Sequence, residues 1–221
     1  LFRSANAAEM KAASSGNPMI LEEMELRTTI RKLEGLQYAH DKQQFRIHDS
    51  IKHNQNVIAL QEKTQANLEK DIQTRDQKGS KEFSIKVEGK TYTKRKDGGA
   101  RLLLSAAALA KSGKPFKKVG VYSGFTITLD NLEQRGFVVS LIGAGEYQID
   151  VKDIAQADPT GLSTRIANIT KGFESQMEQS KAWQEEAETV IPGLKEQLGT
   201  WEKAGELDAA KKRHADVIKE L

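Results

Sequence analysis

The feature that most constrains the fold of this chain is a long stripe of side chains that recur in alternating steps of three and four residues. Such spacing keeps side chains on one face of an α-helix, and it continues from Ile30 to Ile72 without a proline. Asn17 followed by Pro18 is a typical helix start, with an N-cap and a proline in the first turn. The pattern predicts one helix over residues 17–79, roughly 90 Å long at the ordinary helical rise. The stripe consists of Ile30, Leu33, Gln37, His40, Gln44, Ile47, Ile51, Asn54, Ile58, Gln61, Gln65, Leu68 and Ile72.

A second stripe with the same spacing follows Asp158-Pro159 and extends to the end of the sequence. It predicts a second long helix over residues 158–221, which Pro192-Gly193 is expected to kink or break. Both stripes are only half apolar, so their pairing should be weak, and an antiparallel coiled-coil arm is the economical arrangement. The pattern leaves open whether the helices pair within one chain or between two chains.

The residues between the two helices change to the alternation of apolar and polar side chains that is typical of strands. A hairpin is expected at Glu88-Gly89, followed by a helix that Asp97 caps and Gly113 ends. The next alternating run is predicted to be one strand with a bend at Gly124, and two further strands follow it. The expected order is therefore ββαβββ, an antiparallel sheet with one helix.

Together these patterns predict an α+β chain in four parts. Residues 1–16 form a short helix or a tail, 17–79 the first coiled-coil helix, 80–157 a small basic domain at the tip of the arm, and 158–221 the second coiled-coil helix. Charged residues make up 29% and hydrophobic residues 38%, which suits long solvated helices better than a compact globule. Both ends are expected to be cuts within a longer chain.

The composition also limits the function. Cysteine is absent, which excludes disulfides, thiolate catalysis and cysteine-type zinc sites and agrees with a cytoplasmic location. No apolar run approaches the roughly 18 residues of a membrane span, so no membrane partner is expected.

No motif in the sequence predicts catalysis. Gly89-Lys90-Thr91 resembles the end of a phosphate-binding loop, but the position of that loop's first glycine holds Ser84. His48 and His53 are spaced so that they do not share a helical face as metal ligands. We therefore expect this chain to be no enzyme, to bind no cofactor, metal or small-molecule substrate, and to act by contact.

The main chemical feature is a basic segment between Lys78 and Lys118, where twelve basic side chains face three acidic ones. Such a segment suits a phosphate backbone, because each neutralised phosphate releases counterions. Tyr92, Phe116 and Tyr122 lie among these cations and are candidates for stacking on bases. The alternative is a solubilising basic surface with the aromatic rings in the core. The candidate nucleic-acid-binding residues are Lys86, Lys90, Lys94, Arg95, Lys96, Arg101, Lys114, Lys117 and Lys118.

Residues 8–23, AEMKAASSGNPMILEE, carry a family resemblance. They resemble a segment that follows the helicase core in very large phage, plasmid and integrative-element proteins. These proteins fuse an adenine-specific DNA methyltransferase-like domain to a superfamily-two helicase, and they include anti-restriction proteins packaged by phages. Further short matches are scattered in similar order over most of the chain. They are Leu33 to Leu36 with His40-Asp41, the Gly89 hairpin with Arg95, Gly124-Phe125, and Thr160 to Asn168.

The resemblance implies a C-terminal region that lies beyond the helicase motor and works together with the rest of the parent chain. The resemblance implies a parent that binds ATP or S-adenosylmethionine, whereas this chain should bind neither. It has no Asn-Pro-Pro-Tyr, Walker A or DEAH motif, so no catalytic residue is assigned. The expected function is a non-catalytic accessory region that contacts DNA through the basic tip domain. The alternative is a coiled-coil spacer or protein-interaction module without nucleic-acid binding, and self-association stays open.

Overall fold

A computed structural model describes residues 17–132 and 136–221 of the chain. The expected helix or tail over residues 1–16 lies outside the described part. The described residues form five helices and one six-stranded antiparallel sheet, so the α+β class is confirmed. The chain divides into two compact units. The first comprises the described residues up to Asn54 together with Thr189–Leu221, and the second is Gln55–Glu188.

The long N-terminal helix is present as α2, Pro18–Lys78, with 61 residues. Its start agrees with the sequence, because the side-chain oxygen of Asn17 accepts a hydrogen bond from the backbone N–H of Met19 at 3.0 Å. None of the five described helices is long and apolar enough to cross a membrane.

The C-terminal helical stretch is divided into three helices: α4 (Pro159–Lys171), α5 (Phe173–Glu196) and α6 (Ala204–Glu220). Of the two outcomes expected at Pro192-Gly193, a kink or a break, the break is wrong, because α5 continues through Pro192 to Glu196. Pro192 has no N–H to donate to the carbonyl of Glu188, and both residues are exposed. The observed interruption lies at residues 197–203, which include Gly199.

Within the first unit, α6 lies antiparallel to the beginning of α2. The direction follows from two ion pairs. Lys211 pairs with Glu34, whereas Arg213, which comes later in α6, pairs with Glu22, which comes earlier in α2. Few apolar side chains are buried in this unit. They are Leu33, Ile47, Ile51, Leu207 and Val217.

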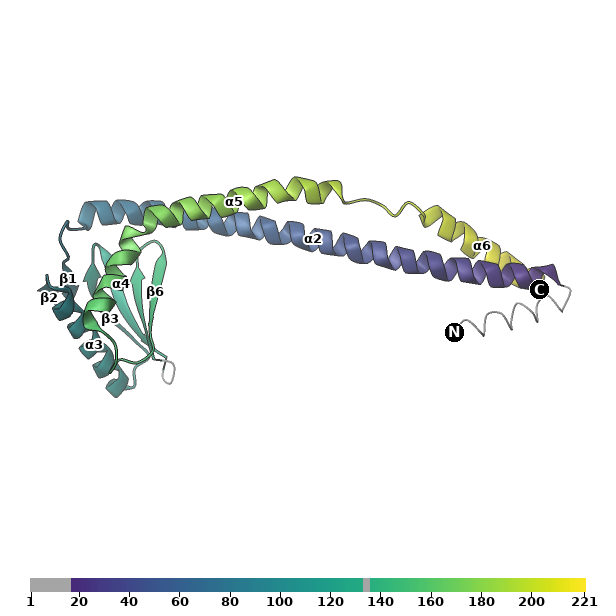
Figure 1. Ribbon diagram of the computed structural model, residues 1–221. Coiled ribbons are helices and arrows are strands. Elements are labelled where there is room, and N and C mark those ends of the chain that lie inside the picture. The colour runs from purple at the N-terminus through teal and green to yellow at the C-terminus, as the bar shows by residue number, and fades with distance from the viewer. Residues whose placement is uncertain (1–16, 133–135) are drawn as a thin grey trace. The chain divides into compact units, whose positions relative to one another are not determined.

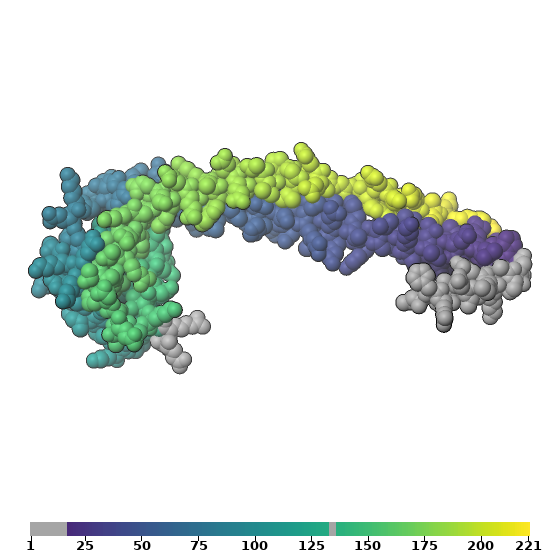
Figure 2. All heavy atoms as spheres, in the orientation of Figure 1, coloured from purple at the N-terminus to yellow at the C-terminus, as the bar shows by residue number. Residues whose placement is uncertain are grey.

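The second unit is built on the sheet, with the strand order β2-β1-β3-β4-β5-β6 and antiparallel pairing throughout. Figure 1 shows α3 (Arg95–Ser112) and α4 on the same side of this sheet, and the space-filling view shows α4 covering it (Figure 2). The strands are β1 (Ile85–Val87), β2 (Lys90–Tyr92), β3 (Phe116–Tyr122), β4 (Phe125–Asn131), β5 (Phe137–Ile142) and β6 (Glu146–Val151).

The predicted order ββαβββ is corrected to ββαββββ. The run read as one bent strand is a hairpin of β3 and β4, and Ser123 and Gly124 form its turn with φ values of 47° and 89°. Two consecutive positive φ angles fit the tight turn that joins twisted antiparallel strands. The hairpin predicted at Glu88-Gly89 is confirmed and has the same geometry, with φ values of 46° and 84°.

The helix predicted after the first hairpin is confirmed as α3, but Asp97 is not its cap. The N-cap position is Lys94, whose side chain makes no capping hydrogen bond, and Asp97 lies in the first turn. Gly113 ends the helix in the left-handed conformation, as predicted, with φ 66°. Gly99 allows α3 and α4 to approach closely, because a Cβ atom there would lie 1.8 Å from the carbonyl oxygen of Pro159.

The core of the second unit lies between the sheet and α3 with α4. Its strand residues alternate with residues of the opposite face, and its helical members include Leu102, Leu109, Ile166 and Phe173. Leu68 of α2 belongs to the same core and is only 1% exposed.

Candidate nucleic-acid interface

The structure distributes the nine predicted basic residues over the β1–β2 hairpin, α3 and β3. It does not bring all nine into one surface. Arg101 and Lys117 pair with an acidic side chain, and Arg95 contacts Phe83 and Thr164; the other six form no ion pair with any described residue.

Glu88 neutralises two of the nine. Its carboxylate accepts hydrogen bonds from Nη2 of Arg101 on α3 and from Nζ of Lys117 on β3. The hydrogen bond from Lys117, together with the charges of Lys117 and Arg101, lowers the pKa of Glu88 below its usual value. The Glu88 side chain is only 24% exposed, so this cluster links the hairpin to α3 and β3.

Arg95 has a structural role as well. Its guanidinium lies 5.4 Å from the centre of the Phe83 ring, and Nη1 donates to the hydroxyl of Thr164 at 3.4 Å. The hydroxyl of Ser163 in turn donates to the backbone carbonyl of Arg95 at 2.8 Å. Arg95 therefore fastens the start of α3 to α4, and it is only partly exposed.

Six lysines remain exposed and without an acidic partner among the described residues. Lys90 lies 5.6 Å from the centre of the Tyr92 ring, which leaves its charge accessible. Lys86, Lys90 and Lys118 lie on strands of the sheet, whereas the others lie at the start of α3 and in the loop after it. The six are Lys86, Lys90, Lys94, Lys96, Lys114 and Lys118.

The strand register places Lys86 and Lys118 on the same face of the sheet. Lys86 pairs with Val121, and Lys118 pairs with Thr128, whose neighbours Ile127 and Leu129 point into the core. We call the side opposite α3 and α4 the open face. It is exposed along β1 and β3, whereas Thr128, Val138 and Ser140, which lie on the same side in β4 and β5, are buried. Along β1 and β3 the open face presents Lys86, Phe116, Lys118 and Val121.

Of the three aromatic residues predicted to stack on bases, the structure makes one available. Tyr122 is 8% exposed and packs against Phe83 with 5.7 Å between ring centres. Tyr92 is partly buried against the core. Phe116 is 53% exposed on the open face.

Sequence reasoning missed a buried carboxylate that joins α2 to the sheet. Asp71 is 1% exposed and accepts hydrogen bonds from the backbone N–H groups of Ala144 and Gly145 at 2.7 and 2.8 Å. It also accepts one from the hydroxyl of Tyr147 at 2.7 Å. Burial, together with this hydrogen bond, raises the pKa of Tyr147 above its usual value. The only signal in the sequence is the glycine-rich turn at residues 143–145, whose backbone donors need an acceptor.

A second link between α2 and the following helices is formed by Arg75. Its guanidinium binds Glu174 through both terminal nitrogens and donates to the backbone carbonyl of Thr170 at 2.9 Å. The hydrogen bond from Arg75 lowers the pKa of Glu174 to about 2. Both Asp71 and Arg75 have partners inside the unit, so we assign them to the structure and not to a ligand.

Among residues 17–132 and 136–221, no group of three or more histidine, aspartate or glutamate side chains is arranged to hold a metal ion. A pocket between β6 and α4 is lined by acidic and basic side chains together, including Asp150, Asp153 and Arg165.

No protein-family model, curated protein or solved structure matches this chain.

Proposed function

We propose that this chain is a non-catalytic accessory region that contacts DNA through the second unit, with its six unpaired lysines bound to phosphates. The observation that supports this most is the distribution of partners. The carboxylate of Glu88 neutralises Arg101 and Lys117, whereas the six exposed lysines have no acidic partner among the described residues. Lysines without internal partners are available to an anionic polymer.

The resemblance to helicase–adenine methyltransferase fusion proteins of phages and other mobile elements belongs to the same proposal. In that setting the chain lies beyond the motor, and its lysines hold DNA while the parent acts. A cytoplasmic location is part of the proposal, since the chain has no cysteine.

We further propose that the predicted coiled-coil arm is formed by α2 with the C-terminal helices of the same chain. In the first unit, α6 pairs with α2 through Arg213–Glu22 and Lys211–Glu34. In the second unit, the hydroxyl of Ser180 on α5 donates to Oε1 of Gln61 at 2.8 Å. These contacts support pairing within one chain.

The proposal is tested by charge reversal at four of the six lysines: K86E, K94E, K96E and K118E in one chain. We expect the chain to bind duplex DNA at low salt and the fourfold variant to lose most of that binding. The slope of log affinity against log salt should be shallower, by roughly one for each phosphate that is no longer bound. Fluorescence anisotropy at several salt concentrations measures both quantities.

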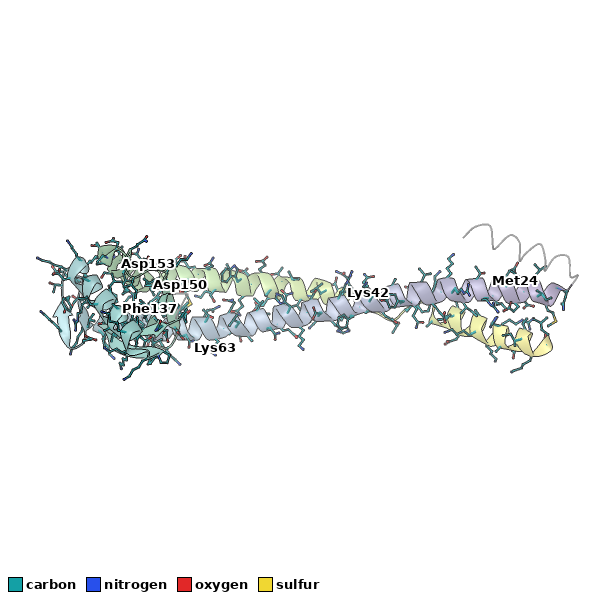
Figure 3. The ribbon with its side chains drawn as sticks, turned by 90° about the horizontal axis from the view of Figure 1, so that it is seen from below. Met24, Lys42, Lys63, Phe137, Asp150 and Asp153 are labelled. Carbon is teal, nitrogen blue, oxygen red and sulfur yellow. The ribbon has the colours of Figure 1, made fainter. Side chains whose placement is uncertain are left out.

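A matched control changes the net charge equally at exposed lysines elsewhere: K42E, K52E, K63E and K181E. Lys42 and Lys63 lie on α2, as marked in Figure 3, and none of the four takes part in an ion pair among the described residues. The control should bind almost as well as the unchanged chain. Equal loss in both variants would show a non-specific charge effect, and unchanged binding in the first would refute the interface.

A specific observation also supports the alternative, a module that binds another protein. Tyr38 and Phe45 lie seven residues apart on α2 and are 70% and 72% exposed. A spacing of seven residues places both side chains on one face of the helix, as is typical of a helix that packs against a partner helix. Light scattering after size exclusion tests self-association through this pair. A dimer that the double variant Y38S/F45S disrupts would support a homodimeric module. A monomeric chain would exclude one.

A further inference from the structure

We propose that the open face binds single-stranded nucleic acid, with a base stacked on Phe116 and the sugar-phosphate backbone on Lys86 and Lys118. This inference rests on the proposed function and names its substrate class. The observation behind it is the register of β3. Phe116, Lys118 and Val121 of this strand lie on one face because a bulge shifts the register between Lys118 and Gly120. Without the bulge, Lys118 and Val121 would point to opposite faces.

The exposed surface of this strand has the composition of a stacking site. Phe116 is 53% and Val121 39% exposed, and both are flanked by lysines that lack an acidic partner among the described residues. A flat aromatic ring beside cations is the usual arrangement for binding a single strand, because every base has a π face and every nucleotide a phosphate. A base inside a duplex is already stacked on its neighbours and cannot lie on Phe116.

The rest of the open face determines the side on which the phosphates lie. Asp130 pairs with Phe116 across β3 and β4, and Asp150 follows on the same row through Val138. These carboxylates repel phosphates but tolerate uncharged bases. The backbone should therefore follow β1 and β3 on the lysine side, while the bases point across Phe116 towards β4.

The experiment measures the affinity of the full chain for a fluorescent oligothymidine of about 15 nucleotides and for a duplex of equal length. We expect F116A to weaken single-strand binding by roughly 5- to 100-fold, which is the range for the loss of one stacked base. F116W should retain the binding, and F116A should leave duplex binding nearly unchanged. L104A serves as the control, since Leu104 is an exposed apolar residue (60%) on α3.

The outcomes separate this inference from the proposed function. If F116A left both duplex and single-strand binding unchanged while the fourfold lysine variant lost both, the stacking site would be overturned. The DNA interface would then remain intact. Binding to neither nucleic acid at low salt would overturn both. Equal loss with L104A and F116A would likewise refute a specific role of the ring. Thermal melting of F116A should match that of the unchanged chain, because the side chain lies largely in solvent.

D150N sharpens the test of the backbone path. Removing this negative charge from the open face should tighten single-strand binding by about two- to threefold at low salt, and the gain should fade as salt is added. An unchanged or weaker affinity would contradict the repulsion by which this acidic row directs the backbone to the lysine side.

Discussion

The two units of the chain bury side chains in different ways. In the second unit, a sheet and two helices enclose side chains such as Phe125, Ile127 and Phe173, which are 0% exposed. In the first unit, few apolar side chains are buried, and exposed ion pairs such as Arg213–Glu22 join α6 to α2 beside the buried Leu207 and Val217. Apolar burial is insensitive to salt, whereas exposed ion pairs are screened by it. The second unit should therefore be the stable one, and the first should open locally under milder conditions.

The largest effect is expected from Phe125→Ala in the second unit. Phe125 contacts Phe173 with 5.5 Å between ring centres, and its removal leaves a cavity in the core. The free energy of unfolding should fall by about 3–5 kcal/mol. Urea unfolding followed by circular dichroism measures this loss, and L104A should change it by less than about 0.5 kcal/mol. A loss below about 1 kcal/mol for Phe125→Ala would contradict the proposed core.

The next effect is expected from Asp71→Ala, which deprives two backbone N–H groups and the hydroxyl of Tyr147 of their acceptor. Because these donors are left without a partner in a buried place, the cost should be about 2–4 kcal/mol. Y147F removes only one of the bonds and should cost about 1 kcal/mol. Amide hydrogen exchange at Ala144 and Gly145 provides an independent readout. Unchanged protection there in Asp71→Ala would refute the anchor.

A smaller effect is expected from the Arg75–Glu174 pair as the pH is lowered. Binding to Arg75 lowers the pKa of Glu174 from 4.5 to about 2, so its contribution is present above pH 4.5. It is lost as the pH falls from 4.5 towards 2, when the carboxylate takes up a proton. The Glu174 side chain is 56% exposed, so solvent limits this contribution to less than about 1 kcal/mol. E174Q should remove that part of the acid dependence of unfolding, and an identical pH profile for E174Q and the unchanged chain would refute it.

The smallest effect on global unfolding is expected in the first unit from Arg213→Ala. The side chain is largely in solvent, and the substitution removes only its pair with Glu22. We expect faster hydrogen exchange in α6, an effect that added salt imitates in the unchanged chain, with little change in the unfolding of the second unit. If Arg213→Ala instead lowered the stability of the sheet, the two units would not be independent.

The fold was predictable where local pattern decides structure. Asn17-Pro18 begins α2 as expected, and the alternating apolar residues expected in the core, such as Phe125, Ile127 and Leu129, lie in strands. The β3–β4 turn was missed because apolar residues continue on both sides of Ser123-Gly124, and one glycine in such a run also fits a bend. The continuation of α5 through Pro192 was missed because a proline inside a helical pattern usually ends or kinks the helix.

The candidate site was predictable as a charged segment but not as a surface. Lys117 reaches Glu88 only because β1 pairs with β3, and Arg101 reaches it from α3, so no local pattern shows that both cations are neutralised. The exposure of Phe116 depends on the same register, whereas Tyr122 of the same strand is turned into the core. Sequence alone weighs all nine cations and all three rings equally.

The most direct test of the proposed DNA interface is to titrate the isotope-labelled chain with unlabelled DNA at low salt and to monitor its amide chemical shifts by NMR. The account predicts shifts confined to the β1–β2 hairpin, the start of α3 and β3, with the first unit unchanged. With a single strand, the largest shifts should lie around Phe116 and Lys118. Shifts concentrated in the first unit, or none at any DNA concentration, would contradict it.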